Sequence, residues 1–268
     1  MSLTTVLGII LGFGLFVSSI VLKTANYMLF LDFASFIMVI GGTFAATFIA
    51  FESRYVLNAL RVTASIMFVH RFSRSILTNE VGRVIRWGYI VQKSGLPGLE
   101  ADARNLARQD RFLGFAIDLV ISGYNGNEIR EILRNTVETT FERSVINADI
   151  LRSMGNTAPA FGMIGTLVGL IIMLDSMASD PSQLGPGMSV ALITTLYGVL
   201  AARLVFLPAA SKIQQREEIV QFRNYLLAEG MALLAERKSP RYIQDKMNSF
   251  LDPSIHFNID RHLKARPA

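Results

Sequence analysis

The chain has 268 residues, of which 51% are hydrophobic, with a formal net charge of +5 and no cysteine. The missing cysteines fit a protein that uses neither disulfides nor thiol chemistry, and His70, His256 and His262 are too widely separated for a metal site. No glycine-rich phosphate-binding motif precedes a lysine, so nucleotide-driven work has no site. We therefore expect neither enzymatic activity nor a cofactor.

The apolar residues gather in four segments that contain no Asp, Glu, Lys or Arg. A helix needs about 20 mostly apolar residues to cross a hydrocarbon core about 30 Å thick. The four segments approach or reach that length, and they occupy residues 3–22, 33–51, 155–174 and 188–202. They predict four transmembrane helices in two hairpins. No basic residue precedes the first segment, so we expect it to be retained and not removed as a signal peptide.

The basic residues next to these segments indicate one orientation in the membrane. Seven of them flank one side: Arg54, Arg61, Arg143, Arg152, Arg203, Lys212 and Arg216. The opposite side has Lys23 alone, together with Asp32, Asp175 and Asp180. Because basic residues concentrate in cytoplasmic loops, both termini should be cytoplasmic. The positive net charge thus reflects topology, and we expect no nucleic acid partner.

The charged stretch between the two hairpins predicts a helical domain. Apolar and charged residues alternate at helical spacing in residues 81–92 and 99–121, and Ser94-Gly95 and Pro97-Gly98 separate these stretches. After residues 123–126 a further helix, capped by Asn127, should run without a break into the third membrane segment.

A mixed-charge helical tail follows the fourth segment. Ser239-Pro240 should begin a short helix that extends to about Phe250, and residues 252–268 should be loosely ordered. The predicted fold class is an all-α polytopic membrane protein. Its predicted domains are a first transmembrane hairpin (1–51), a cytoplasmic helical domain (52–154), a second transmembrane hairpin (155–208) and a cytoplasmic tail (209–268).

Small residues share one face of each helix in the second hairpin. The third segment has Pro159, Gly162, Thr166, Gly169 and Met173, and the fourth has Ala191, Thr195, Gly198 and Ala202. Such faces bring helices close together. One interpretation is packing alone, with each threonine hydroxyl bonded to the carbonyl four residues earlier.

The other interpretation is a polar lining for an ion. An ion in hydrocarbon needs a compensating charge, and none of the four segments contains Asp or Glu. If the protein conducts ions, the carboxylate must come from a partner helix. The chain would then form one half of a channel.

Two stretches of the second hairpin carry a specific resemblance. Residues 156–170, NTAPAFGMIGTLVGL, resemble the third membrane helix of the MotA/PomA stator family, particularly its PomA branch. Residues 187–208, GMSVALITTLYGVLAARLVFLP, resemble the fourth helix of that branch. The opening LGIILGF and the loop LFLDFAS are similar to its first hairpin, and the resemblance extends to about Leu251.

This resemblance implies a flagellar stator subunit of the bacterial inner membrane. It implies a homopentamer, embedded in lipid, around a dimer of a MotB/PomB-type partner that supplies the membrane Asp and a peptidoglycan-binding domain. Ion flow would turn the pentamer against FliG, the switch-complex protein of the rotor. An ExbB/TolQ-type proton-driven energiser is the alternative, which the complete first hairpin disfavours. A membrane scaffold or lipid-binding protein without transport is a third interpretation.

The resemblance also assigns roles to residues of the second hairpin. Thr166 and Thr195 match positions that line the ion path, on faces shared with Pro159, Gly162, Gly169 and Gly198. The proton-driven branch typically has Ala at the position of Thr166, so Na⁺ is the favoured ion and H⁺ the alternative. Pro159 and Pro208 match the two family prolines that bend helices, although Pro208 could instead simply end its helix.

Outside that hairpin, Asp32 matches a loop acid found where the ion enters, and a solvated loop charge is the alternative. Lys93 and Glu100 match rotor-contact positions, while Gln92 stands where the family usually has Arg. Arg104, Arg108 and Arg111 offer a further basic set, and a solvated helix face is the alternative for all of these charges.

Overall fold

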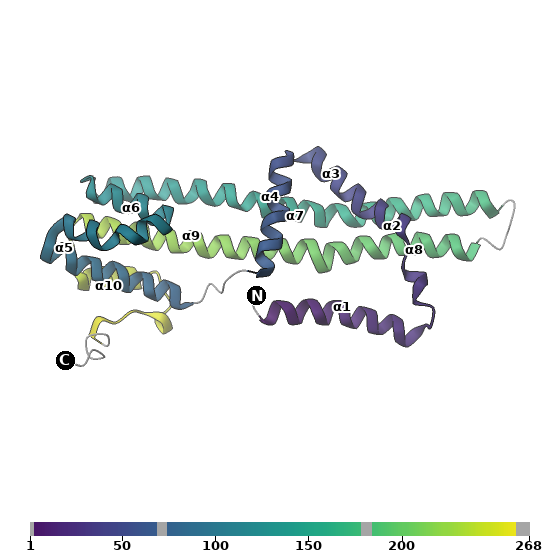
Figure 1. Cartoon of the computed structure of the whole chain (residues 1–268), viewed down its shortest axis with the longest axis horizontal. Helices are drawn as coiled ribbons and strands as arrows, with labels where there is room; N and C mark the ends of the chain where they lie inside the picture. Colours follow the sequence, from purple (N-terminus) through teal and green to yellow (C-terminus); the bar gives the residue numbers. More distant parts are fainter. Residues whose placement is uncertain (1–2, 69–73, 178–183, 261–268) are drawn as a thin grey trace. The chain divides into compact units, whose positions relative to one another are not determined.

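The computed structural model describes residues 3–68, 74–177 and 184–260, and this part of the chain is helical with short connections (Figure 1). No strand occurs among these residues, which confirms the predicted all-α class. The chain forms two compact units. Met1–Arg71 with Ser144–Gln215 make up the apolar unit, and Phe72–Arg143 with Arg216–Ala268 make up the charged unit. Helices α7 (Gly126–Met177) and α9 (Leu207–Ala235) contribute residues to both.

The apolar unit contains the predicted membrane segments. Its other elements are α1 (Leu3–Lys23), η1 (Tyr27–Phe30), α2 (Phe33–Phe36), η2 (Ile37–Gly41), α3 (Gly42–Ala50), α4 (Ser53–Phe68), α8 (Leu184–Leu200) and η4 (Ala201–Phe206). Three helices of the described chain are long and apolar enough to cross a membrane: Tyr27–Ala50, Gly126–Ser176 and Leu184–Ala235. The first segment qualifies only as a shorter apolar helix, Ile10–Lys23, so this count does not confirm the predicted four spans.

The second predicted segment is one continuous helical run with a wide turn inside it. The π turn η2 joins α2 to α3 at Gly41 and Gly42. A Cβ atom at Gly42 would lie only 2.2 Å from the ring of Phe161 on α7. The glycine therefore lets the α3 backbone approach the face of α7 closely.

Pro208 does not end its helix. α8 leads through the π turn η4 into α9, and the N–H of Leu207 donates to the carbonyl of Ala202, five residues earlier. Pro208 has no N–H, and its ring would crowd the carbonyl four residues before it in a regular α-helix. The wide turn directly before it accommodates the ring. The interpretation of Pro208 as a helix stop is therefore wrong.

In the charged unit, α5 (Arg74–Gln109) folds back on itself at Gly95, whose φ of 69° and ψ of −166° are available essentially only to glycine. Trp87 Nε1 donates to Asp102 Oδ2 at 2.8 Å, and Arg86 pairs with the same carboxylate. The two halves of α5 therefore lie side by side. The break at Ser94-Gly95 is confirmed, and the reversal of the chain there was not predicted.

A second break interrupts the predicted helical stretch 99–121. Asp110 caps α6 (Arg111–Ile121) by accepting a hydrogen bond from the Leu113 N–H. Its carboxylate also meets Arg223 at 2.6 Å, and Arg223 contacts Glu80 at 2.8 Å. Burial lowers the pKa of the Arg223 guanidinium, but Glu80 and Asp110 raise it by more, so the buried cation stays charged. These ion pairs join α5, α6 and α9.

Asn125, and not Asn127 as predicted, caps α7. Its side-chain oxygen accepts from the N–H groups of Asn127 and Glu128, and the Glu128 carboxylate accepts from the Asn125 N–H. This reciprocal capping box places the start of the helix two residues earlier than the sequence pattern indicated. From there α7 continues without interruption to Met177, which confirms the predicted unbroken helix.

The end of the described chain is held in place. α10 (Pro240–Asn248) begins at Ser239 and Pro240 as predicted, and η5 (Pro253–Ile255) follows it. Asn248 exchanges two hydrogen bonds with the backbone of Phe257, and Gln244 accepts one from the Ile259 N–H. The prediction of loose order is therefore wrong for residues 252–260. The remainder, 261–268, lies outside the described residues.

Candidate ion path

The hydroxyls of Thr166 on α7 and Thr195 on α8 face each other within the apolar unit. Their Oγ1 atoms are 2.5 Å apart. Thr166 Oγ1 also lies 2.9 Å from the carbonyl oxygen of Ala191 on α8 and 3.1 Å from that of Gly162 on its own helix. The back-bond expected for plain packing is therefore present at Thr166. It is accompanied by contacts that cross to the neighbouring helix.

These two hydroxyls have more acceptors around them than protons to donate. Thr195 Oγ1 also lies 3.3 Å from the Gly162 carbonyl, and does not bond back to Ala191 on its own helix. Each hydroxyl supplies one proton and two lone pairs, whereas a carbonyl only accepts. The pair therefore leaves oxygen lone pairs unused, and both residues are half-buried. Such oxygens can serve as ligands for a cation.

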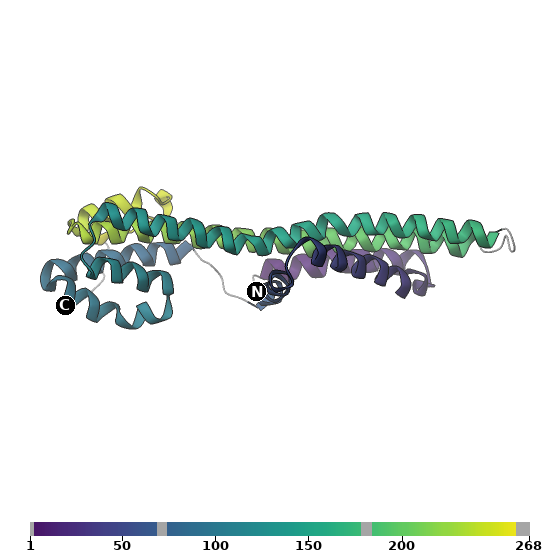
Figure 2. The same cartoon turned by 90° about the horizontal axis from the view of Figure 1, so that it is seen from above.

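Glycines bring α7 and α8 close enough for this contact, and the two helices run side by side in both views (Figure 1 and Figure 2). A Cβ atom at Gly162 would lie 3.0 Å from the Thr194 carbonyl oxygen, and one at Gly169 would lie 3.2 Å from Ala191. At Gly198 it would lie 2.6 Å from the Ala158 carbonyl oxygen. The predicted small-residue faces thus meet backbone to backbone.

Pro159 lies inside α7, opposite Gly198. The Cα of Pro159 would be 3.1 Å from a Cβ atom at Gly198. Because proline has no N–H, the carbonyl of Gly155 lacks its usual donor within the helix. Pro159 thus lies beside Gly198 on the α7–α8 interface that also contains the two facing threonines, and α7 continues through it.

Asp32 lies in the connection between η1 and α2 and caps α2. Its Oδ2 accepts from the Ser35 N–H at 2.7 Å. The N–H of Asp32 donates to the hydroxyl of Tyr197 on α8 at 3.1 Å. Nothing in the sequence marks Tyr197 as a site residue, because an aromatic residue inside an apolar segment gives no sign of a distant backbone partner.

Lys93 and Glu100 lie in the charged unit, on either side of the fold-back at Gly95, and both are exposed. Arg104, Arg108 and Arg111 are exposed as well. All five belong to the charged unit, whereas the threonine pair belongs to the apolar unit. The two sets of predicted site residues therefore lie in different units.

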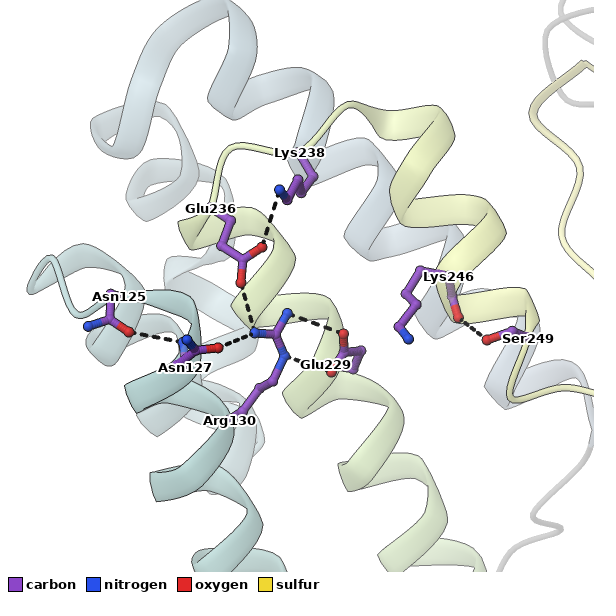
Figure 3. Close-up of polar contacts among 8 residues, drawn as sticks. All are labelled: Asn125, Asn127, Arg130, Glu229, Glu236, Lys238, Lys246 and Ser249. Carbon is purple, nitrogen blue, oxygen red and sulfur yellow. Dashed lines mark hydrogen bonds and ion pairs between the residues drawn. The ribbon is translucent and has the colours of Figure 1, made fainter.

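The charged unit also contains a polar network that no sequence pattern indicated (Figure 3). Arg130 on α7 contacts Glu229 on α9 at 2.9 Å and Glu236, in the turn directly after α9, at 2.8 Å. Its hydrogen bond to Glu229 is the main factor that raises its pKa. Lys238 pairs with Glu236 at 3.6 Å. These charges compensate one another and fasten α7 to α9, so we assign the network to structure.

Comparison with known proteins identifies similar chains. The sequence profile of the MotA/TolQ/ExbB proton channel family matches residues 105–225. The chemotaxis protein PomA of Vibrio alginolyticus is 31% identical over 94% of this chain and 96% of its own length. The flagellar MotAB stator complex of Bacillus subtilis has a chain with a TM-score of 0.83 and 25% identity, covering 97% of this chain and 98% of that one. A chain of C. jejuni MotAB shares the fold, with a TM-score of 0.83, 23% identity and coverage of 94% and 97%.

Gly198→Ala should loosen the α7–α8 interface. The added methyl group meets backbone atoms of Ala158 and Pro159, which cannot rotate away, and such overpacking costs about 1–3 kcal/mol. We expect a lower melting temperature of the purified chain in detergent. Gly185→Ala on the same helix is the matched control, because nothing lies within 4 Å of its new methyl group. Equal melting temperatures for the two variants would contradict the close contact.

Proposed function

The chain belongs to the MotA/TolQ/ExbB family of proton channels, and from this premise we propose that it is a stator subunit of a bacterial flagellar motor. Members of this family are ion-channel subunits and not enzymes. The observation that carries the proposal is the facing pair Thr166 and Thr195, which offers oxygen ligands between the uncharged segments 155–174 and 188–202. In this function the chain converts ion flow into torque on the rotor.

The chain supplies half of the conducting path. The four apolar segments contain no Asp or Glu, so a cation that crosses the membrane between them needs a carboxylate from another chain. A MotB/PomB-type subunit with a membrane Asp would supply it, and the similarity to the MotAB structures supports such a partner. The energy available is about 2.3 kcal/mol per charge per 100 mV. Without that partner, the chain should not conduct usefully.

The proposed assembly is a homopentamer around that partner in the inner membrane. Four spans, 3–22, 33–51, 155–174 and 188–202, would place both termini, residues 52–154 and residues 209–268 in the cytoplasm. Lys93 and Glu100 would then contact FliG on the rotor. Pro159 and Pro208 would let the helices beside the ion path change their bend, and Asp32 would receive ions from outside.

The proposed ion is Na⁺, with H⁺ as the alternative. The Thr166 hydroxyl can replace part of the hydration shell of sodium, whereas a proton needs no such ligand. Two observations support this choice: the similarity to PomA, and a threonine at position 166, where the proton-driven branch typically has Ala. An ExbB/TolQ-type role is less well supported, because the similarity to PomA covers 94% of the chain, including the first hairpin.

Thr166→Ala and Thr195→Ala should each reduce swimming speed while leaving the protein in the membrane. Each substitution removes a hydroxyl from the pair and with it a ligand oxygen. Thr157→Ala is the matched control, since the Thr157 hydroxyl only bonds back to Ser153 on its own helix. Speed is measured by video tracking and membrane abundance by immunoblotting. Normal speed in both pair variants would refute the proposed path.

Swimming speed should rise with external Na⁺ at constant pH if sodium drives the motor. Choline chloride in place of sodium chloride keeps ionic strength constant and serves as the control. Cells tracked over a range of sodium concentrations should show saturation. Speed that ignores sodium and collapses on addition of a protonophore would assign the motor to H⁺.

Lys93→Glu and Glu100→Lys should reduce torque without changing ion leak, because both side chains are exposed and belong to the charged unit. Torque is measured from the rotation of a bead attached to a filament, and leak from growth on overexpression. Glu131→Lys, an exposed charge reversal on α7, is the control. Unchanged torque in both test variants would show that Lys93 and Glu100 are only solvated surface charges without a rotor contact.

A further inference from the structure

The Tyr197 hydroxyl joins α8 to the loop that contains Asp32. It accepts a hydrogen bond from the Asp32 N–H at 3.1 Å and donates one to the Phe30 carbonyl oxygen at 2.5 Å. These partners are 165 and 167 residues away in sequence. One hydroxyl therefore uses its donor and an acceptor lone pair on a single short stretch of backbone.

That stretch needs a partner because it is not helical. η1 ends at Phe30, Leu31 and Asp32 are extended, and α2 begins at Phe33. The Leu31 N–H still donates to the Met28 carbonyl oxygen, but the Asp32 N–H and the Phe30 carbonyl take their partner from outside the segment. A buried backbone group without a partner costs free energy. Tyr197 satisfies both of these groups from the neighbouring helix.

The aromatic ring of Tyr197 makes a separate contact. It meets the ring of Phe36 edge-on, with centroids 6.4 Å apart and an interplanar angle of 80°. Phe36 is the last residue of α2, one turn after the start of that helix. The ring and the hydroxyl thus hold opposite ends of α2, so their effects can be separated by substitution.

The same contacts fix the orientation of the Asp32 carboxylate. The Tyr197 hydroxyl accepts a hydrogen bond from the Asp32 N–H, and Asp32 Oδ2 accepts one from the Ser35 N–H at 2.7 Å. Asp32 Oδ1 has no hydrogen-bond or ion-pair partner among the residues that the structure describes, and Asp32 is only half-buried. One carboxylate oxygen is therefore held while the other remains available.

Thr195 and Tyr197 point in different directions from α8. Residues two apart on a helix are about 200° apart around its axis. Thr195 meets Thr166 on α7, whereas Tyr197 meets the loop before α2. A change in the position of α8 would therefore reach both the threonine pair and the loop.

We propose that Tyr197 is a positioning residue, whose hydroxyl holds the Asp32 loop against α8 and so sets how readily the stator takes up its ion. The claim about ion uptake rests on the proposed function. The claim that Tyr197 holds the Asp32 loop against α8 rests on the hydrogen bonds and the ring contact alone.

Tyr197→Phe removes the hydroxyl and keeps the ring. Because the chain has no cysteine, a nitroxide can be attached to Leu31→Cys, a position 70% exposed, in the full stator complex. We expect higher label mobility at this position in the Tyr197→Phe background, and no change for a label on Leu22→Cys in α1. Phe36→Leu, which removes the ring contact and keeps the hydroxyl, should change mobility less. Unchanged mobility at position 31 overturns the inference.

In cells, Tyr197→Phe should raise the ion concentration for half-maximal swimming speed by about 2- to 10-fold, the range expected for one hydrogen bond, with maximal speed retained. Tyr27→Phe is the matched control, because the exposed hydroxyl of Tyr27 has no hydrogen bond among the described residues. If Tyr197 acts through Asp32, the shift should disappear in an Asp32→Asn background.

A shift that persists in that background, or an equal loss of speed at every ion concentration, overturns the claim about ion uptake. Failure of the proposed function is distinguished by the threonine pair: normal speed of Thr166→Ala and Thr195→Ala would refute the channel role. The label result would still decide whether Tyr197 holds the loop.

Discussion

The close approach of α7 and α8 is the constraint on which the rest of the apolar unit depends. At Gly198 the two backbones are so near that even a methyl group would lie 2.6 Å from the Ala158 carbonyl oxygen. Only at this separation can the short threonine side chains reach across to each other and to the opposite carbonyls. In a bilayer such contacts replace the hydrophobic effect as the source of helix association, because lipid tails are as apolar as leucine. The contact between Thr166 and Thr195 therefore depends directly on the tight packing of α7 against α8.

Helix α8 combines three contacts within a short length. Thr195 faces α7, Gly198 packs against Pro159, and Tyr197 holds the loop of Asp32. This arrangement links the proposed ion path to the point at which ions would enter. In the proposed function the chain would present the neutral oxygens of Thr166 and Thr195 and leave the negative charge to a partner, because its four apolar segments contain no Asp or Glu.

The charged unit is organised by ion pairs around a sharp backbone fold. Gly95 lets α5 reverse, and Trp87 and Arg86 close the reversal on Asp102. Arg223 joins α5, α6 and α9 through Glu80 and Asp110, with its own side chain only 14% exposed. Breaking a buried pair of this kind leaves an uncompensated charge, so these contacts fix the arrangement of the helices. Lys93 and Glu100, the proposed rotor-contact residues, are exposed on either side of the fold.

The sequence alone determined the all-α class, the break at Gly95, the start of α10 at Ser239 and the small-residue faces of the second hairpin. Each of these depends on local periodicity or on the special backbone of Gly and Pro. It placed the cap of α7 two residues too late and gave no sign of the helix break at Asp110. It also predicted loose order for residues 252–260, which are held by hydrogen bonds, and it left open whether Pro208 ends its helix. Those features depend on side chains that find partners far along the chain, such as Asp110 with Arg223. Tyr197 and the Thr166–Thr195 contact are of the same kind. Spacing placed each threonine on a face, but only the tertiary structure decided that the two hydroxyls meet, because that requires the relative rotation of two helices.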